Sequence, residues 1–117
     1  MKYELTKEAD ALLCILYANY KQKNKTMPRD KARKCGHLSE IIKLVGSEFN
    51  EEDTKDLCYE LKHNGLMWIG DADDTIFMSE LTTKAIAYMQ NRSGNEIKQI
   101  VKSVFSTVPQ VFKILGM

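Results

Sequence analysis

The sequence predicts a mostly helical α+β domain, and three observations lead to this prediction. Apolar residues recur at helical spacing in several segments, the first of which is LTKEADALLCILYANY at 5–20. Two apolar runs flank the turn GDADD at 70–74, which is the pattern of a β-hairpin. Signals that end a helix, Gly46 and Asn64-Gly65, separate these segments. Together they indicate helices, then a hairpin, then further helices.

The composition is that of one soluble globular domain. The chain has 117 residues, of which 44% are hydrophobic and 28% are charged, and its formal net charge is +1. The longest apolar run, ALLCILYA at 11–18, is too short to span a bilayer, so we expect no membrane partner. Three widely spaced cysteines are typical of reduced thiols, which predicts a cytoplasmic protein.

The first half of the chain is expected to hold two helices joined by a basic connector. An amphipathic helix over 6–23 begins at Thr6, a residue type that caps helix N-termini. The connector over 24–34 contains Pro28, which can open one short helical turn. A second helix then places Leu38, Ile41, Ile42 and Val45 on one face, and Gly46 ends it.

The second half is expected to hold a third helix, a hairpin and two more helices. Asn50 caps the third helix, which ends at Asn64-Gly65. Strands are predicted at about 66–69 and 75–79, joined by a turn over 70–74. A fourth helix begins at Thr82 or Thr83 and continues to Arg92. A fifth helix follows Ser93-Gly94.

The segment HLSEIIKLVGSEFNEEDTKDLCYELKHNGLMWIG at 37–70 resembles a winged helix-turn-helix domain. LTTKAIAYM at 81–89 is similar to a phrase that is common in bacterial winged-helix regulators, with Ala85 where the family usually has Gly. The stretch over 37–92 resembles small YjcQ-like proteins of bacteria and phages. The resemblance implies a winged helix-turn-helix with a two-stranded wing and extra C-terminal helices. Residues 1–92 would form this domain, and 93–117 a helix and tail of the same domain or an oligomerisation element.

The resemblance also implies DNA binding, but the charge pattern restricts where it could occur. The third helix of such a domain usually enters the major groove, yet residues 51–62 carry a net charge of −3, and the wing tip adds three aspartates. Residues 21–34 carry +6, while the rest of the chain carries −5. The predicted DNA-contacting residues are Lys21, Lys23, Lys25, Arg29, Lys31, Arg33, Lys34, Lys55, Tyr59, Lys62 and His63. The alternative is that the basic stretch is a solvated, mobile loop.

The C-terminal segment carries more apolar residues than a small core needs, which predicts a homodimer. The alternative is that this helix completes the core of a single copy. The predicted interface residues are Ile97, Ile100, Val101, Val104, Phe105, Val108, Phe112 and Leu115.

No catalytic, cofactor or metal site is predicted. Cys35-x-His37 and Cys58-x4-His63 contain zinc-ligand residue types, but their spacings differ from the usual close pairs. No nucleophile with an orienting acid is identifiable, so we do not expect an enzyme. The sequence therefore predicts a DNA-binding, regulator-like protein. The alternative is a winged helix that binds no DNA and offers its acidic third helix and wing to a protein partner.

Overall fold

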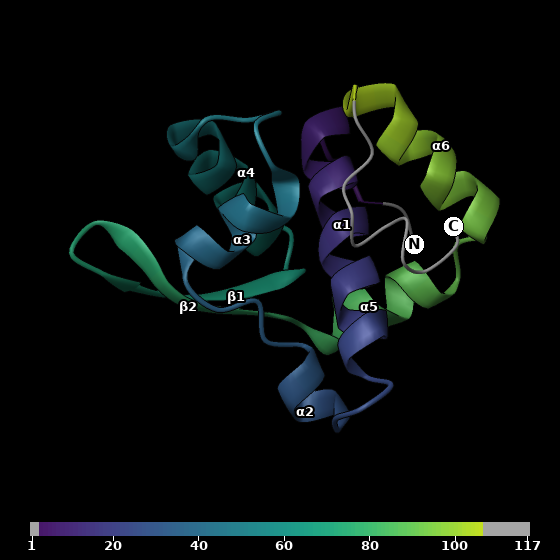
Figure 1. The fold of residues 1–117 in the computed structure, drawn as a ribbon, viewed down its shortest axis with the longest axis horizontal. Helices are drawn as coiled ribbons and strands as arrows, with labels where there is room; N and C mark the ends of the chain where they lie inside the picture. The colour runs from purple at the N-terminus through teal and green to yellow at the C-terminus, as the bar shows by residue number, and fades with distance from the viewer. Residues whose placement is uncertain (1–2, 107–117) are drawn as a thin grey trace.

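The computed structural model describes residues 3–106 of the chain, and its elements follow the predicted order (Figure 1). Helices and the two strands of one antiparallel sheet make it an α+β fold in which helix predominates. The elements are α1 Lys7–Lys23, α2 Arg29–Ala32, α3 Leu38–Val45, α4 Glu51–His63, β1 Met67–Ala72, β2 Thr75–Leu81, α5 Thr83–Gln90 and α6 Gly94–Val104.

Helix α1 is the central element of the core and is buried on more sides than the predicted amphipathic pattern indicates. Its start is as predicted, because the Thr6 hydroxyl accepts a hydrogen bond from the Ala9 amide at 3.2 Å. Residues 11–18 are all buried, so most of the helix has no solvent face. A helix that is apolar on all sides is stable in water when neighbours surround it. Here α3, α4, α5 and α6 all pack against α1.

Helices α3 and α4 begin and end where the sequence predicts. Gly46 follows α3 with φ +71°, and Gly65 follows α4 with φ +75°, a conformation that favours glycine. The Asn50 side chain caps α4 by accepting from the Asp53 amide at 2.8 Å. After Gly65 the Leu66 amide returns to the Leu61 carbonyl at 3.0 Å, which directs the chain into β1.

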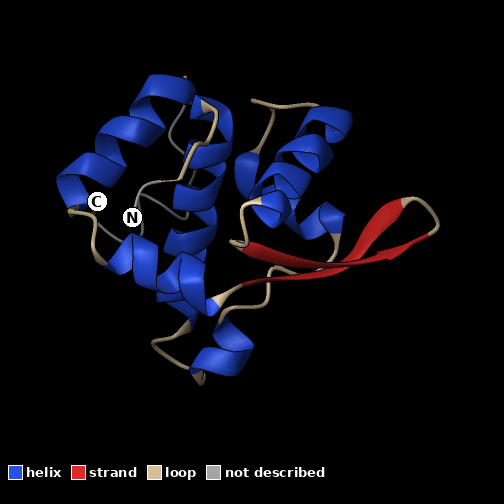
Figure 2. Ribbon diagram, turned by 180° about the vertical axis from the view of Figure 1, so that it is seen from behind, coloured by secondary structure: helices blue, strands red, loops and turns tan. Residues whose placement is uncertain are grey.

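The hairpin formed by β1 and β2 is longer than predicted. The turn contains only Asp73 and Asp74, both at positive φ, so the expected five-residue turn over 70–74 is wrong. The pairing register shifts by one residue between Gly70 and Asp71, which leaves Phe77 without a partner across the hairpin. Figure 2 shows the two strands in red, projecting away from the helices.

A short backbone contact joins the residues before α3 to the hairpin, and no pattern in the sequence predicts it. Lys34 forms an isolated antiparallel bridge with Glu80 of β2. The Leu81 amide donates to the Arg33 carbonyl at 2.9 Å, and the Cys35 amide donates to the Ser79 carbonyl at 2.8 Å. The end of the basic connector therefore lies along the outer edge of β2.

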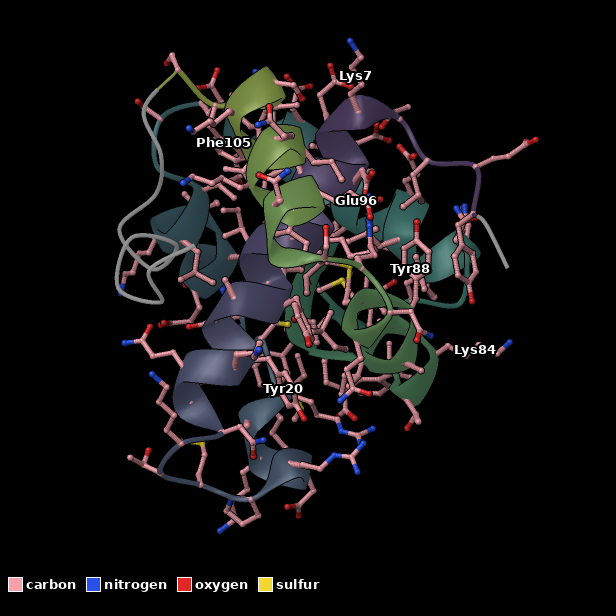
Figure 3. The ribbon with its side chains drawn as sticks, turned by 90° about the vertical axis from the view of Figure 1, so that its right-hand side faces the viewer. Lys7, Tyr20, Lys84, Tyr88, Glu96 and Phe105 are labelled. Carbon is pink, nitrogen blue, oxygen red and sulfur yellow. The ribbon has the colours of Figure 1, made fainter. Side chains whose placement is uncertain are left out.

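Helices α5 and α6 complete the fold on the other side of α1. Thr82 caps α5, as the sequence predicted, and Ser93, which was predicted only to break the preceding helix, caps α6. Viewed from that side, α6 lies across α1, and Phe105 follows its last turn (Figure 3). Phe105 packs edge-on against Phe49, with ring centroids 5.5 Å apart, which joins the end of α6 to the loop before α4.

Candidate nucleic-acid interface

The basic segment, residues 21–34, surrounds α2 at one end of the molecule (Figure 1). Five of its seven cationic side chains are exposed, and Lys23 and Arg33 are half-buried. Three of the seven have contacts within the chain, one of them the Lys21 ammonium, which lies 5.8 Å from the centroid of the Tyr17 ring. Lys23 Nζ donates to the Lys34 carbonyl at 2.5 Å, and Arg33 Nη1 donates to Thr83 Oγ1 at 3.3 Å. Within residues 3–106, none of the seven cations forms an ion pair.

The second group of predicted DNA contacts, on the outer face of α4, is occupied by the hairpin. Lys55 Nζ donates to the backbone carbonyl of Asp74 at the hairpin turn. The Tyr59 hydroxyl donates to Asp71 Oδ1 at 2.6 Å. The Lys62 ammonium lies over the Tyr59 ring, 5.6 Å from its centroid, and His63 is exposed. The polar groups of Lys55 and Tyr59 are therefore engaged within the chain, beside aspartates that would repel phosphate.

The contact between Tyr59 and Asp71 has a consequence that titration can measure. The hydrogen bond to the Asp71 carboxylate, with a smaller contribution from burial, raises the pKa of Tyr59 to about 12. We expect Asp71→Asn to lower this pKa towards the ordinary tyrosine value of about 10. Between pH 10 and 12 the variant should then contain more ionised tyrosine than the wild type, measured by ultraviolet absorbance. Identical titration curves for the two proteins would contradict this contact.

The same bond also contributes to stability in a defined pH range. Because the folded-state pKa of Tyr59 is raised, its contribution is complete below the unfolded-state pKa near 10 and is lost as the pH rises towards 12.

The two groups of predicted contacts do not form one continuous surface. In Figures 1 and 2, α4 lies on one side of the hairpin and α2 lies on the other, below the hairpin's base. The chain reaches β2 at Lys34 and crosses to the α3–α4 side from there. A single straight duplex that contacts the basic segment would therefore not also contact the outer face of α4.

The predicted dimer surface is largely used inside one copy. Ile97, Val101 and Phe105 are buried in the core, because α6 packs along α1, so these three do not present an exposed face to a second copy. Ile100 and Val104 are half-buried against the same core. This placement corrects the expectation for the described part of the stripe. The other predicted interface residues, Val108, Phe112 and Leu115, lie outside the described residues.

The three cysteines are buried, whereas His37 and His63 are exposed. Burial raises the pKa of Cys14, Cys35 and Cys58 to about 12, so all three remain protonated at neutral pH. His37 is exposed, and its Nδ1 accepts from the Ser39 amide at 3.1 Å, which caps α3. In the part of the chain from 3 to 106, no group of three or more His, Cys, Asp or Glu side chains could hold a metal ion.

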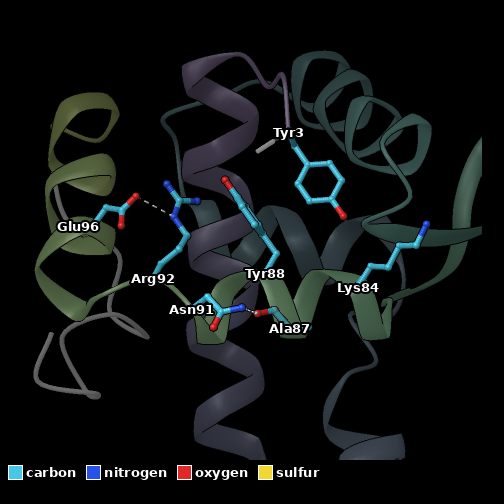
Figure 4. Close-up of a pocket in the computed structure, with 7 residues that line it drawn as sticks. All are labelled: Tyr3, Lys84, Ala87, Tyr88, Asn91, Arg92 and Glu96. Carbon is cyan, nitrogen blue, oxygen red and sulfur yellow. Dashed lines mark hydrogen bonds and ion pairs between the residues drawn. The ribbon is translucent and has the colours of Figure 1, made fainter. Parts of the chain in front are cut away.

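A cavity of about 570 Å³ opens between Tyr3, which precedes α1, and α5 (Figure 4). Tyr3 and Tyr88 meet edge-on at its wall, with ring centroids 4.9 Å apart, and Lys84 lies at one side. The guanidinium of Arg92 stacks 5.1 Å from the Tyr88 centroid. That group is already held by Asp10, at 2.7 and 3.1 Å, and by Glu96 at 3.3 Å. The charge of Arg92 therefore stabilises the packing of α1 against α5 and α6.

Comparison of the chain with protein-family models, with curated proteins and with solved structures found no match. Among the described helices, none has the length and apolar composition that crossing a bilayer requires.

Proposed function

We propose that this chain is a winged helix-turn-helix protein that binds duplex DNA through its basic segment, as a transcriptional regulator-like protein. The order of elements supports the fold assignment. Along the chain, α1 is followed by α3 and α4 and then by the hairpin of β1 and β2. Lys34, which precedes α3, pairs with the second strand of that hairpin. This arrangement agrees with the resemblance of residues 37–92 to winged helix-turn-helix domains.

The observation that supports the DNA contact is the uncompensated charge of the basic segment. Its net charge is +6, and its one acid is Asp30. The described residues supply no ion-pair partner for any of its cations. Cations without ion-pair partners are available to neutralise phosphates, and the release of counterions from DNA provides most of the non-specific affinity. Arg29 is exposed on α2 and can bind a phosphate with two parallel hydrogen bonds.

The proposed contact reads the backbone of DNA more than its bases. Helix α4, the element that would enter the major groove, is acidic, and its Lys55 and Tyr59 are bonded to the hairpin. Phosphate contacts fix the position of a protein on a duplex but carry no sequence information. We therefore expect similar affinity for duplexes of different sequence.

A comparison of two charge-matched variants tests this proposal. The first replaces four exposed cations of the basic segment with glutamine. The matched control replaces four exposed lysines elsewhere in the chain with glutamine, so both variants have the same net charge. The first set is Lys21, Lys25, Arg29 and Lys31, and the control set is Lys7, Lys43, Lys84 and Lys102.

Fluorescence anisotropy with a labelled random duplex provides the measurement. We expect the basic-segment variant to bind about tenfold more weakly or worse at low salt, because each lost phosphate contact removes counterion release. The control variant should bind as the wild type does. Equal weakening in the two variants would show a general effect of net charge, and a wild type that does not bind would exclude the function.

A further inference from the structure

The outer face of the hairpin carries large apolar side chains that the fold leaves in solvent. Trp68 is 50% exposed and Met78 46%, and both lie on this face because their cross-strand partners are Glu80 and Gly70. Phe77 is 57% exposed, but it lies at the register shift, and its ring is 6.4 Å from the His37 ring at the start of α3. Met67 and Ile69 alternate with Trp68 and point into the core, so the exposure follows from the strand period. Exposed clusters of this kind, and tryptophan above all, are typical of protein interfaces.

The same face is acidic. Residues 67–81 contain four carboxylates and no lysine or arginine. The Asp71 carboxylate accepts a hydrogen bond from the Tyr59 hydroxyl, on the side of α4. The other three surround the apolar patch, because Asp73 and Asp74 form the turn and Glu80 is the cross-strand partner of Trp68. A surface that binds this face should therefore be cationic and should contain an apolar side chain.

The basic segment of the chain itself has both properties. It carries +6, and it contains Met27, which at 36% exposure is the remaining large apolar side chain in solvent among the described residues. It also lies on the correct side of the molecule. In Figures 1 and 2, α3 and α4 lie on one side of the hairpin, and α2 lies beyond its base on the opposite side. The two patches meet where Lys34 pairs with Glu80.

We propose that the outer hairpin face of one copy docks on the basic segment of a second copy. Within one copy the hairpin projects away from α2, and no ion pair joins the two patches in residues 3–106. Because both patches border the same side of the molecule, two copies related by a twofold axis make the contact twice. The self-association uses surfaces distinct from the stripe of α6 that is buried against α1.

This contact shares the basic segment with the proposed DNA interface, so a duplex and a second copy would compete for it. The two proposals can nevertheless fail separately, because self-association is measured without nucleic acid.

Charge-swapped variants test the contact. The hairpin variant replaces the turn with Asn-Gly, which favours the same positive-φ turn, and adds lysines on the outer face. The basic-segment variant reverses four exposed cations. A third variant reverses the four control lysines elsewhere. The hairpin variant carries Ala72→Lys, Asp73→Asn, Asp74→Gly and Glu80→Lys. The basic-segment variant carries Lys21→Glu, Lys25→Glu, Arg29→Glu and Lys31→Glu. The control variant carries Lys7→Glu, Lys43→Glu, Lys84→Glu and Lys102→Glu.

Sedimentation equilibrium over a concentration series measures the association. The wild type should change from one copy to two as its concentration rises, and added salt should reverse the change. The hairpin variant and the basic-segment variant should each remain single copies. An equimolar mixture of these two should again form a complex of two copies, because each patch now meets one of opposite charge. The control variant should associate as the wild type does.

Tryptophan emission gives a second readout, since Trp68 is the single tryptophan of the sequence. Its emission should shift to shorter wavelength as the wild type associates and should not shift in either charge-swapped variant alone. A wild type that remains a single copy at all concentrations would overturn the proposal. Association that persists in both variants, or that leaves the emission unchanged, would show that a different surface is used.

Discussion

A chain that ends at Arg92, without α6, is expected to lose its cooperative fold. The deletion removes Ile97, Val101 and Phe105, each of which is at most 4% exposed, and it uncovers the side of α1 on which α6 packs. Full burial of a large apolar side chain contributes about 1.5–3 kcal/mol, so these three contribute about 5–9 kcal/mol together. The total stability of a domain is about 5–15 kcal/mol.

Circular dichroism during thermal unfolding measures this effect. The matched control is a chain that ends at Ser106, which retains every core residue that the structure describes. We expect the control to unfold in one cooperative transition and the chain that ends at Arg92 to show none. Cooperative unfolding of the shorter chain at a similar temperature would show that the core does not require α6. The apolar residues of α6 would then again be predicted to form an interface with a second copy.

Asp10→Asn is expected to cause a larger loss of stability than substitution of a surface ion-pair residue. Asp10 lies on α1 and accepts two hydrogen bonds from Arg92, at 2.7 and 3.1 Å, across 82 residues of sequence. The Arg92 side chain is only 9% exposed, so loss of the carboxylate leaves a poorly hydrated charge without its main partner. Breaking one side of a buried pair costs about 3–5 kcal/mol, and we expect about 3 kcal/mol because Asp10 is partly exposed.

Chemical denaturation of the purified variant gives this free energy. Glu96→Gln is the internal control, because Glu96 also contacts Arg92, at 3.3 Å, but its side chain is 54% exposed. An exposed pair contributes only about 0.2–1 kcal/mol. Equal destabilisation by the two substitutions would contradict the conclusion that the Asp10 pair, and not the surface pair, joins α1 to the loop between α5 and α6.

The parts of the fold that local residue chemistry determines could be predicted from the sequence. The limits of α3 and α4 follow from Asn50, Gly46 and Gly65, because capping and positive φ depend on a few neighbouring residues. The hairpin follows from two apolar runs and its aspartates. Its length could not be predicted, because Asp71 remains in the strand while its side chain bonds Tyr59 on a different element.

Contacts between distant segments determine the rest. The burial of α1 on all sides depends on four other helices, so a count of apolar positions on one face understates it. The residues around Lys34 show no strand pattern, so its pairing with Glu80 could not be predicted. This pairing places the basic segment on the side of the hairpin opposite α4. The cationic residues of the candidate site could therefore be predicted from the sequence, but their separation into two groups by the fold could not.

The salt dependence of duplex binding tests the central claim most directly. The wild type should lose affinity steeply as salt rises, with a slope of log affinity against log salt of about −4 or steeper if four or more phosphates are contacted. The variant with glutamine at Lys21, Lys25, Arg29 and Lys31 should show a slope smaller by about one unit for each lost contact. A flat salt dependence of the wild type, or the same slope in both proteins, would contradict binding through the basic segment.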